Sequence, residues 1–258
     1  DLVYMKIFLS ESLVDYRTYT FNYALYCIQE DKNEIPEIYQ RGFLPYSNKL
    51  DLEEEVYYMA RSLRVDLSLF SETSENKRVL KKIAELNPEF RIIPINDFNT
   101  EDINFQEFCL HFARERFSEP LSEERLQYIL KWKSLSHIFE FTLEGNVVGY
   151  VLTVMEGDTL HYWFAFFDLN YPAYSLGKYM MFSVIDWAKK NGIGFVYLGT
   201  VYGEKALYKA RDFKGLEFFD GNRWQNDLPQ LKSKCKSDEH FETDSFKKDT
   251  AGFLSGLS

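Results

Sequence analysis

The chain has 258 residues, of which 45% are hydrophobic and 17% aromatic. This composition excludes intrinsic disorder and predicts a packed core, in one large domain or two smaller lobes. The formal net charge of −10 repels nucleic acid and anionic membranes on average, so any RNA contact must be a local basic patch. We expect no DNA partner and no membrane contact.

Cysteine usage and the N-terminal sequence favour the cytoplasm. The three cysteines, Cys27, Cys109 and Cys235, form no Cys-x-x-Cys pair, which favours free thiols over a disulfide framework or a zinc site. The N-terminus lacks a basic region followed by an apolar stretch, and no window reaches the roughly 18 apolar residues of a membrane span. The sequence therefore predicts a cytoplasmic protein without a metal site.

The first third of the chain alternates strand and helix patterns. Strands are predicted over residues 5–9 and 20–28, and a short helix over residues 35–40. Residues 61–70 alternate leucine or valine with polar partners, which is the period of a strand with one buried face. The same alternation puts Arg64 on the face opposite the apolar one.

A capped helix over residues 76–86 and a strand over residues 90–95 follow, and helical spacing then dominates residues 101–132. Three strands within residues 137–168 are separated by glycine-containing turns, so they form an antiparallel meander. A helix begins near Ser175 and ends at a glycine, and a buried strand follows it.

Composition divides the chain into three regions. Residues 1–99 form an N-terminal αβ region, and residues 100–226 hold the meander and the elements after it. Residues 227–258 are a polar tail that we expect to contribute little core.

The order of three antiparallel strands, a helix entered through a glycine turn and a further strand resembles the GNAT superfamily of acyltransferases. This resemblance implies an α+β fold, with a mixed, largely antiparallel sheet flanked by helices and the N-terminal αβ half packed on it. The helix opening at Ser175 and Gly177 could hold a phosphate on its free N–H groups. Of the superfamily's coenzyme A loop, Gln/Arg-x-x-Gly-x-Gly/Ala, only Gly177 matches.

The chain more closely resembles the aminoacyl-tRNA-protein transferases, in particular the arginyl-tRNA-protein transferase family, which has a GNAT-like fold without coenzyme A. The matching segments are DLNYPAYSLGKY (168–179), VYLG (196–199), KALYK (205–209) and FFDGNRW (218–224). The resemblance implies transfer of an amino acid, with arginine as one candidate, from charged tRNA to the N-terminal amine of an acceptor protein or peptide. Aminoacyl-tRNA is then a co-substrate, and no bound cofactor is expected.

A weaker match covers residues 41–47 and 64–82, and two departures accompany it. The family's paired N-terminal cysteines are absent from EVYYMARSLR (55–64), so no metal or iron–sulfur chemistry carries over. The family's longer link after YLG is shortened here to TVYGE (200–204), which leaves the transferred amino acid open.

On the transferase interpretation, Lys205, Tyr208 and Lys209 share one face of a short helix. Tyr208 would donate a proton toward the departing ribose oxygen, and the two lysines would hold the 3′-terminal phosphates. Backbone N–H groups near Gly199 and Thr200 would meet the developing oxyanion. A solvated surface with the tyrosine packed below it is equally typical of such a face.

Three further residues are candidates for contact with substrate. His161 is a possible acid–base group in the third meander strand, and Asp168 could contact the substrate amine; a core histidine and ordinary turn chemistry are the alternatives. Arg64 belongs to a basic cluster that could track the acceptor stem or the phosphates of a coenzyme, although a solvated helix usually has this composition. The other members of this cluster are Arg61, Lys77, Arg78, Lys81 and Lys82.

Two other functions stay open on the sequence alone. A GNAT N-acyltransferase that uses acetyl-CoA or another acyl-CoA on a small amine is favoured by the turn at Ser175 and disfavoured by the poor loop match. A non-catalytic module of the same fold, which binds peptide N-termini or tRNA, is favoured by the missing cysteines and the short link. The oligomeric state is not predicted.

Overall fold

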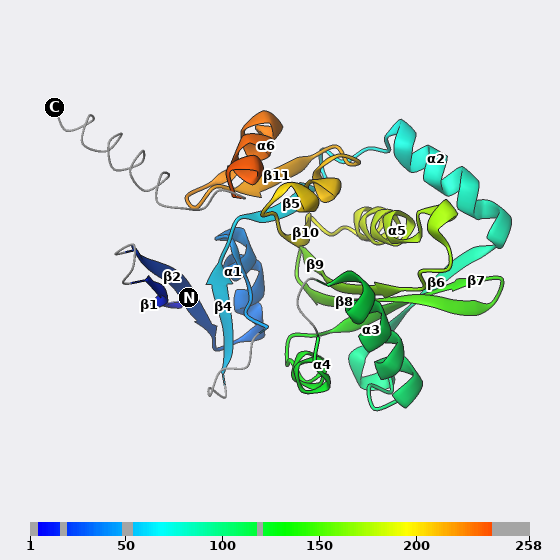
Figure 1. Cartoon of the computed structure of the whole chain (residues 1–258), viewed down its shortest axis with the longest axis horizontal. Helices are drawn as coiled ribbons and strands as arrows, with labels where there is room; N and C mark the ends of the chain where they lie inside the picture. Colours follow the sequence, from blue (N-terminus) through cyan, green and yellow to red (C-terminus); the bar gives the residue numbers. More distant parts are fainter. Residues whose placement is uncertain (1–4, 16–19, 48–53, 118–120, 239–258) are drawn as a thin grey trace.

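The computed structural model describes residues 5–15, 20–47, 54–117 and 121–238. An eight-stranded sheet forms its centre (Figure 1). In spatial order its strands are β12 (Trp224–Gln225), β11 (Leu216–Phe219), β5 (Ser62–Asp66), β10 (Phe195–Thr200), β9 (Thr159–Phe167), β8 (Asn146–Glu156), β7 (His137–Leu143) and β6 (Pro88–Pro94). Only the β9–β10 pair is parallel among these described neighbours. The sheet is therefore mixed and largely antiparallel, as predicted.

Helices cover both faces of this sheet (Figure 1). One face packs against α2 (Ser74–Ile83), α5 (Leu176–Lys190) and α6 (Leu228–Ser237), and the other against α1 (Ile35–Gln40), α3 (Ile103–Arg116) and α4 (Glu123–Leu130). Short 3₁₀ helices are η1 (Lys32–Glu34), η2 (Ala84–Leu86), η3 (Ile95–Asp97), η4 (Pro172–Tyr174) and η5 (Glu204–Ala210). None of the described helices combines the length and apolar character that crossing a bilayer demands.

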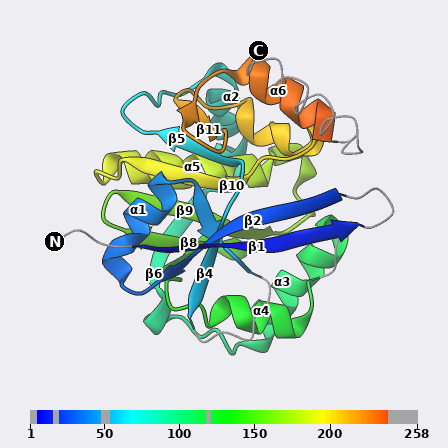
Figure 2. The same ribbon diagram turned by 90° about the vertical axis from the view of Figure 1, so that its left-hand side faces the viewer.

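A smaller antiparallel sheet lies beside α1, with the order β1 (Lys6–Asp15), β2 (Thr20–Gln29), β4 (Glu55–Met59) and β3 (Phe43–Pro45). Turned by 90°, this sheet faces the viewer, with α6 above it and α4 below it (Figure 2). Buried side chains from α1, β3 and β4 continue into the core beneath α3 and α4. The small sheet and the large one therefore share one hydrophobic core.

The strand predicted over residues 61–70 is shorter than expected. β5 ends at Asp66, because the Asp66 carboxylate accepts hydrogen bonds from the backbone N and the Oγ of Ser68 at 2.9 and 2.6 Å. Such Asx turns compete with the strand ladder. Leu69, which the alternation assigned to the buried face, is consequently 60% exposed.

The expectation that the tail contributes little core was wrong for its first part. α6 begins at Leu228, with the Asp227 carboxylate accepting from the backbone N–H of Gln230. Leu231 and Cys235 of this helix are fully buried in the same core as α5. Burial of a leucine side chain is worth about 1.5–3 kcal/mol, so α6 is part of the packed structure. Residues 239–258 of the predicted tail lie outside the described residues.

The large sheet takes strands from both sides of the expected boundary at residue 99. β5 pairs with Val196 on one edge and with Leu216 on the other, both through Val65. β6 pairs with β7 over its whole length. The division into regions at residues 99 and 226 stays a prediction, and the sheet itself crosses the first of these positions.

Gly42 fixes the contact between the turn after α1 and strand β11. Its φ is +84°, and a Cβ at this position would stand 2.2 Å from Cδ1 of the buried Phe219 ring. We expect Gly42→Ala to lower the free energy of unfolding by about 1–3 kcal/mol, because overpacking adds to the left-handed strain. Gly192→Ala is the matched control in urea denaturation, since Gly192 has a φ of +78° and open space around it. Equal losses in the two variants would contradict a role for the Phe219 contact.

Candidate functional site

The parallel strands β9 and β10 pair at one end and then diverge, so they form a fork in the sheet. They pair at Phe195–Thr159, Val196–Leu160 and Tyr197–His161. Beyond His161, β9 continues beside β8, while β10 shifts register against β5. Gly199, with a φ of +80°, lies within the irregular stretch of β10 and supplies a backbone conformation that other residues rarely adopt. The two strands therefore leave a gap in the middle of the sheet.

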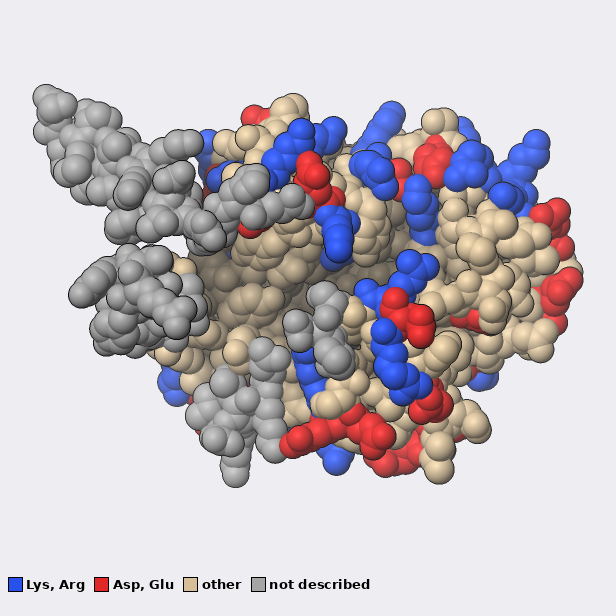
Figure 3. All heavy atoms as spheres, in the orientation of Figure 1, with Lys and Arg blue, Asp and Glu red and all other residues tan. Residues whose placement is uncertain are grey.

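A pocket of about 730 Å³ occupies this gap. Its walls come from β9, the end of α3, the start of α5 and η5, and Lys and Arg side chains gather around the hollow that these elements frame (Figure 3). Most of the lining is apolar: Phe112, Phe117, Tyr162, Trp163, Phe164, Ala165, Phe167, Leu169, Tyr171, Pro172, Leu176, Met181 and Leu198. The charged members of the lining are Arg116, Asp168, Lys178 and Lys209. The pocket in the fork is therefore mainly apolar, and three of its four charged residues are cations.

Five of the residues singled out from the sequence line this pocket together, namely Asp168, Ser175, Gly177, Tyr208 and Lys209. Three others, Thr200, Gly199 and His161, lie near Lys209 and are not part of the lining. The carbonyl of Thr200 accepts from Lys209 Nζ at 3.2 Å. A Cβ on Gly199 would stand 3.8 Å from Lys209 Nζ and 4.0 Å from His161 Nε2. Lys205 and Arg64 do not belong to the lining.

The expectation that Lys205, Tyr208 and Lys209 share one helical face was wrong. Residues 204–210 form a 3₁₀ helix, in which three residues complete a turn. Lys205 and Tyr208 therefore lie above one another, whereas Lys209 is rotated inward. Lys205 is exposed, and Lys209 is half-buried.

Lys209 has an environment unusual for a lysine. Its Nζ lies 5.9 Å from the centre of the Tyr208 ring and has no carboxylate partner among the described residues. Burial lowers the pKa of Lys209 to about 8, because desolvation disfavours the charged form. Burial also raises the pKa of Tyr208, so the phenol keeps its proton at neutral pH. A proton acceptor and a proton donor thus stand side by side at the pocket.

His161 is buried at the apex of the fork. Its Nδ1 lies 2.9 Å from the hydroxyl of Tyr39 in α1, and its Nε2 has no hydrogen-bond partner among the described residues. Burial, helped by the nearby Lys209 charge, lowers the pKa of His161 to about 3. An imidazole that stays neutral does not cycle between acid and base near pH 7, so the lowered pKa favours a neutral hydrogen-bonding role for His161, and the acid–base role stays a prediction.

The start of α5 is packed more tightly than the sequence suggested. Ser175, at the N-cap, has left-handed φ and ψ of 55° and 47°. A Cβ on Gly177 would stand 2.8 Å from Cζ of Phe167, so the close approach that Gly177 allows is to a ring of β9. Lys178 in the first turn pairs with Glu75 and Asp212, each at 2.8 Å.

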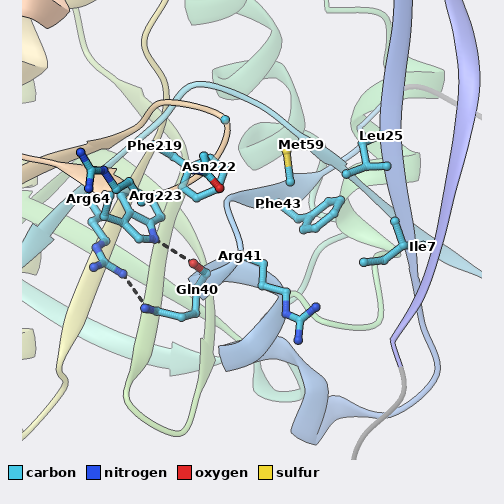
Figure 4. Close-up of a pocket in the computed structure, with 12 residues that line it drawn as sticks. Ile7, Leu25, Gln40, Arg41, Phe43, Met59, Arg64, Phe219, Asn222 and Arg223 are labelled. Carbon is cyan, nitrogen blue, oxygen red and sulfur yellow. Dashed lines mark hydrogen bonds between the residues drawn. The ribbon is translucent and has the colours of Figure 1, made fainter.

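Arg64 lies in a second pocket, of about 560 Å³, between the small sheet and the β11–β12 hairpin (Figure 4). The buried guanidinium stands 4.0 Å from the ring centres of both Phe195 and Trp224. It pairs with Glu217 at 2.7 Å, and its Nη1 donates to Gln40 Oε1 at 2.6 Å. The exposed cluster expected around Arg64 is not formed, because α1 and Trp224 cover this side chain.

Sequence reasoning missed Arg116 and the aromatic pair Phe112 and Phe117 as pocket residues. Arg116 is exposed at the C-terminal end of α3 and makes no ion pair with another described residue. Basic residues are common in the last turn of any helix, so nothing in the local sequence marked Arg116. The described residues contain no group of three His, Cys, Asp or Glu placed to hold a metal.

A family model and individual relatives both match the chain. Residues 100–214 match the family model described as an acetyltransferase (GNAT) domain. An aspartate/glutamate leucyltransferase of Stenotrophomonas maltophilia is 25% identical over 178 residues, which are 65% of this chain and 70% of the relative. An aspartate/glutamate leucyltransferase of Saccharophagus degradans is 25% identical over 170 residues, or 63% and 69% of the two chains.

The similarity of the chain to solved structures is weak. FemX gives a TM-score of 0.46 at 9% identity, covering 88% of this chain and 90% of that one. L-PGS from Bacillus licheniformis gives 0.46 at 12% identity, covering 78% and 69%.

The matches bear on the expectations drawn from the sequence. The GNAT-like α+β fold, the resemblance to aminoacyl-tRNA-protein transferases and the class of enzyme are confirmed. Arginine as the transferred amino acid finds no support, because the relatives are named as leucyltransferases.

Proposed function

We propose that this chain, a GNAT-domain protein of the aminoacyl-tRNA-protein transferase type, moves leucine or a similarly apolar amino acid from charged tRNA to an acceptor polypeptide. The amide forms at the N-terminal amine of an acceptor that begins with an acidic residue. The observation that carries this proposal is the forked pocket, which combines apolar walls with Tyr208, Lys209 and Arg116. Charged tRNA is a cytoplasmic substrate, and we expect the chain to act there.

The pocket lining favours an apolar amino acid over arginine. Asp168 is the single carboxylate among the described lining residues, and its Oδ1 already accepts from the backbone N–H of Asn170 at 2.8 Å. A buried guanidinium needs paired carboxylates or a comparable set of acceptors. The phenyl and aliphatic groups around the fork suit a leucyl side chain instead.

The cationic side chains around the pocket suit the phosphates of the tRNA and the acidic first residue of the acceptor. A terminal nucleotide of tRNA carries phosphate, and the basic side chains around the hollow (Figure 3) supply the local attraction that an acidic protein otherwise lacks. Arg116, which lines the pocket and has no ion-pair partner among the described residues, would pair with the acidic side chain of the acceptor's first residue. The names of the relatives support this choice of acceptor.

The chemistry requires one proton to leave the amine and one to reach the departing oxygen. The acceptor amine attacks the ester carbonyl, the new C–N bond forms, and the bond to the ribose oxygen breaks. Lys209 in its neutral form takes the proton, since its pKa of about 8 matches that of an α-amine, roughly 7.7–8.0. Tyr208 donates to the ribose oxygen and regains a proton from the neighbouring Lys209 ammonium.

The test is transfer from a pool of tRNAs charged with radiolabelled amino acids to peptides that begin with Asp, Glu, Ala or Arg. We expect leucine on the Asp and Glu peptides, with kcat at least about tenfold lower in Tyr208→Phe. Arg116→Met should lower kcat/KM about tenfold for the Glu peptide and leave the Ala peptide unchanged. Absence of transfer from every donor, together with acetylation of a small amine by acetyl-CoA, would replace this proposal with an acyl-CoA enzyme.

A further inference from the structure

The apex of the fork holds a polar atom that the packing leaves without a partner. His161 is 2% exposed, and its Nε2 makes no hydrogen bond to any described residue. A buried polar atom without a partner loses its hydrogen bonds to water and gains none in exchange, which destabilises the fold. Such an atom in a site is therefore a place where a substrate atom or a water molecule would be stabilised.

The missing side chain of Gly199 keeps this place open. The position where its Cβ would stand has no atom nearer than Lys209 Nζ at 3.8 Å and His161 Nε2 at 4.0 Å. Tyr162 and Leu198, the chain neighbours of His161 and Gly199, both line the pocket. Successive side chains of a strand point to opposite faces of the sheet, so the link between the pocket and the unpartnered nitrogen is Lys209, which lines the pocket and whose Nζ stands 3.8 Å from the Cβ position of Gly199.

Tyr39 determines which imidazole nitrogen carries the hydrogen. The Tyr39 hydroxyl is fully buried, and His161 Nδ1, at 2.9 Å, is its one hydrogen-bond partner among the described residues. Burial raises the pKa of Tyr39 well above its ordinary value, so the hydroxyl is neutral, and its buried O–H has a hydrogen-bond partner only if it donates to Nδ1. A neutral imidazole that accepts at Nδ1 carries its hydrogen on Nε2.

We propose that His161 donates a hydrogen bond from Nε2 to the ester carbonyl oxygen as this oxygen becomes an oxyanion, and that Tyr39 is the positioning residue that fixes the tautomer. This inference rests on the proposed transfer and assigns a role within the same site. The His161 imidazole is neutral, and Tyr39 holds it in place before the reaction begins. A preorganised donor of this kind stabilises charge that develops in the transition state more than it stabilises the bound ester.

The groups packed around His161 suit a neutral donor. Tyr39 lies on the α1 side, the ring of Tyr197 in β10 packs at a tilt against Tyr39 with ring centres 4.9 Å apart, and Trp163 lies 6.3 Å from the imidazole centre. Once Lys209 of η5 has taken the proton of the amine, it supplies the nearby positive charge. Because no described carboxylate is bonded to the ring, nothing favours an imidazolium. The oxyanion would therefore meet one fixed N–H and one lysine.

The kinetic test compares two substitutions of similar length at residue 161. His161→Gln keeps an N–H near the position of Nε2, whereas His161→Met has none. With leucyl-tRNA and a Glu peptide in single-turnover reactions, we expect His161→Met to lose about 10- to 100-fold in rate at unchanged peptide KM. His161→Gln should recover most of that loss. His111→Gln, at an exposed position of α3, is the control and should match the parent.

The spectroscopic test reads the tautomer without any substrate. Two-bond ¹H–¹⁵N spectra of the parent should show one histidine locked with its hydrogen on Nε2, and this signal should be absent in both variants at residue 161. Tyr39→Phe should turn the same signal into a mixture of tautomers and lower the transfer rate with little change in KM.

Two results would overturn the role of His161 while leaving the transfer proposal intact. One is equal rates for His161→Met and His161→Gln in an active protein, and the other is a parent spectrum with the hydrogen on Nδ1. A parent chain that transfers no amino acid from any donor would instead overturn the proposed function, and the role of His161 in it. The tautomer spectrum separates that case from a misfolded preparation, because it depends on the fold alone.

Discussion

Substitution of Lys209 by methionine should abolish transfer and stabilise the protein at the same time. The variant lacks the proton acceptor, so we expect kcat/KM to fall about 10²- to 10³-fold. Lys209→Arg should be about as inactive, because a guanidinium stays charged and cannot take a proton from the amine. Activity of the parent should rise with pH up to about 8, where the neutral amine of Lys209 becomes the main form.

The stability effect of Lys209→Met follows from the same lowered pKa. In the unfolded chain a lysine has a pKa near 10.4, and in the folded protein Lys209 has a pKa of about 8. Folding is therefore penalised at every pH below about 8, and the penalty disappears as the pH rises from about 8 toward 10.4. At neutral pH, removal of the amine should add about 1–3 kcal/mol to the free energy of unfolding.

Urea denaturation and transfer assays of the same samples test both effects. Lys214→Met is the matched control, because Lys214 is exposed and lies outside the pocket lining. It should change stability by less than about 0.5 kcal/mol and leave the rate unchanged. A Lys209→Met variant that is both less stable and inactive would point to a structural lysine and contradict its role as proton acceptor.

Arg64→Met should cost about 3–5 kcal/mol of stability, which is the largest loss that we expect from a single substitution. The guanidinium side chain is 6% exposed and its partner Glu217 is 20% exposed. Without Arg64, the Glu217 carboxylate and the Gln40 amide oxygen lose the charge that compensates them. Removal of one partner of a buried pair leaves an uncompensated charge, which is more costly than loss of the pair as a whole.

The double variant Arg64→Met, Glu217→Gln should therefore recover part of the loss in urea denaturation. Arg41→Met is the control, because Arg41 lines the same pocket but its pair with Glu37 is about half exposed on each side. Exposed pairs of this kind contribute about 0–1 kcal/mol. If Arg64→Met and Arg41→Met unfolded at the same urea concentration, Arg64 would not be the structural element described above.

Local sequence patterns predict the elements whose signals are local. The meander from His137 to Phe167 has glycine-containing turns between apolar runs, and the helix from Leu176 follows from an apolar stripe and a terminal glycine. The 3₁₀ form of residues 204–210 could not be predicted in this way. Seven residues are too few to distinguish a period of 3.0 from one of 3.6.

The parts of the site that the sequence missed depend on contacts between distant segments. Alternation placed Arg64 opposite the apolar face, but it could not show that Gln40 and Trp224 would enclose it. The strand pattern identifies His161 as a polar residue in a strand, whereas its tautomer depends on Tyr39, 122 residues away. Arg116 enters the pocket only because α3 ends beside β9.

The position of β5 in the large sheet has a consequence for how the chain reaches its fold. β5 is made early, yet its partners β10 and β11 lie about 130 to 150 positions later in the chain. Pairings so far apart raise the contact order and slow folding. A ribosome would release residues 62–66 long before a strand exists to receive them, and in that interval they form an exposed edge that invites aggregation. A fragment restricted to residues 100–214, the part that the GNAT model recognises, would leave β10 without this neighbour and should be recovered mainly as insoluble protein.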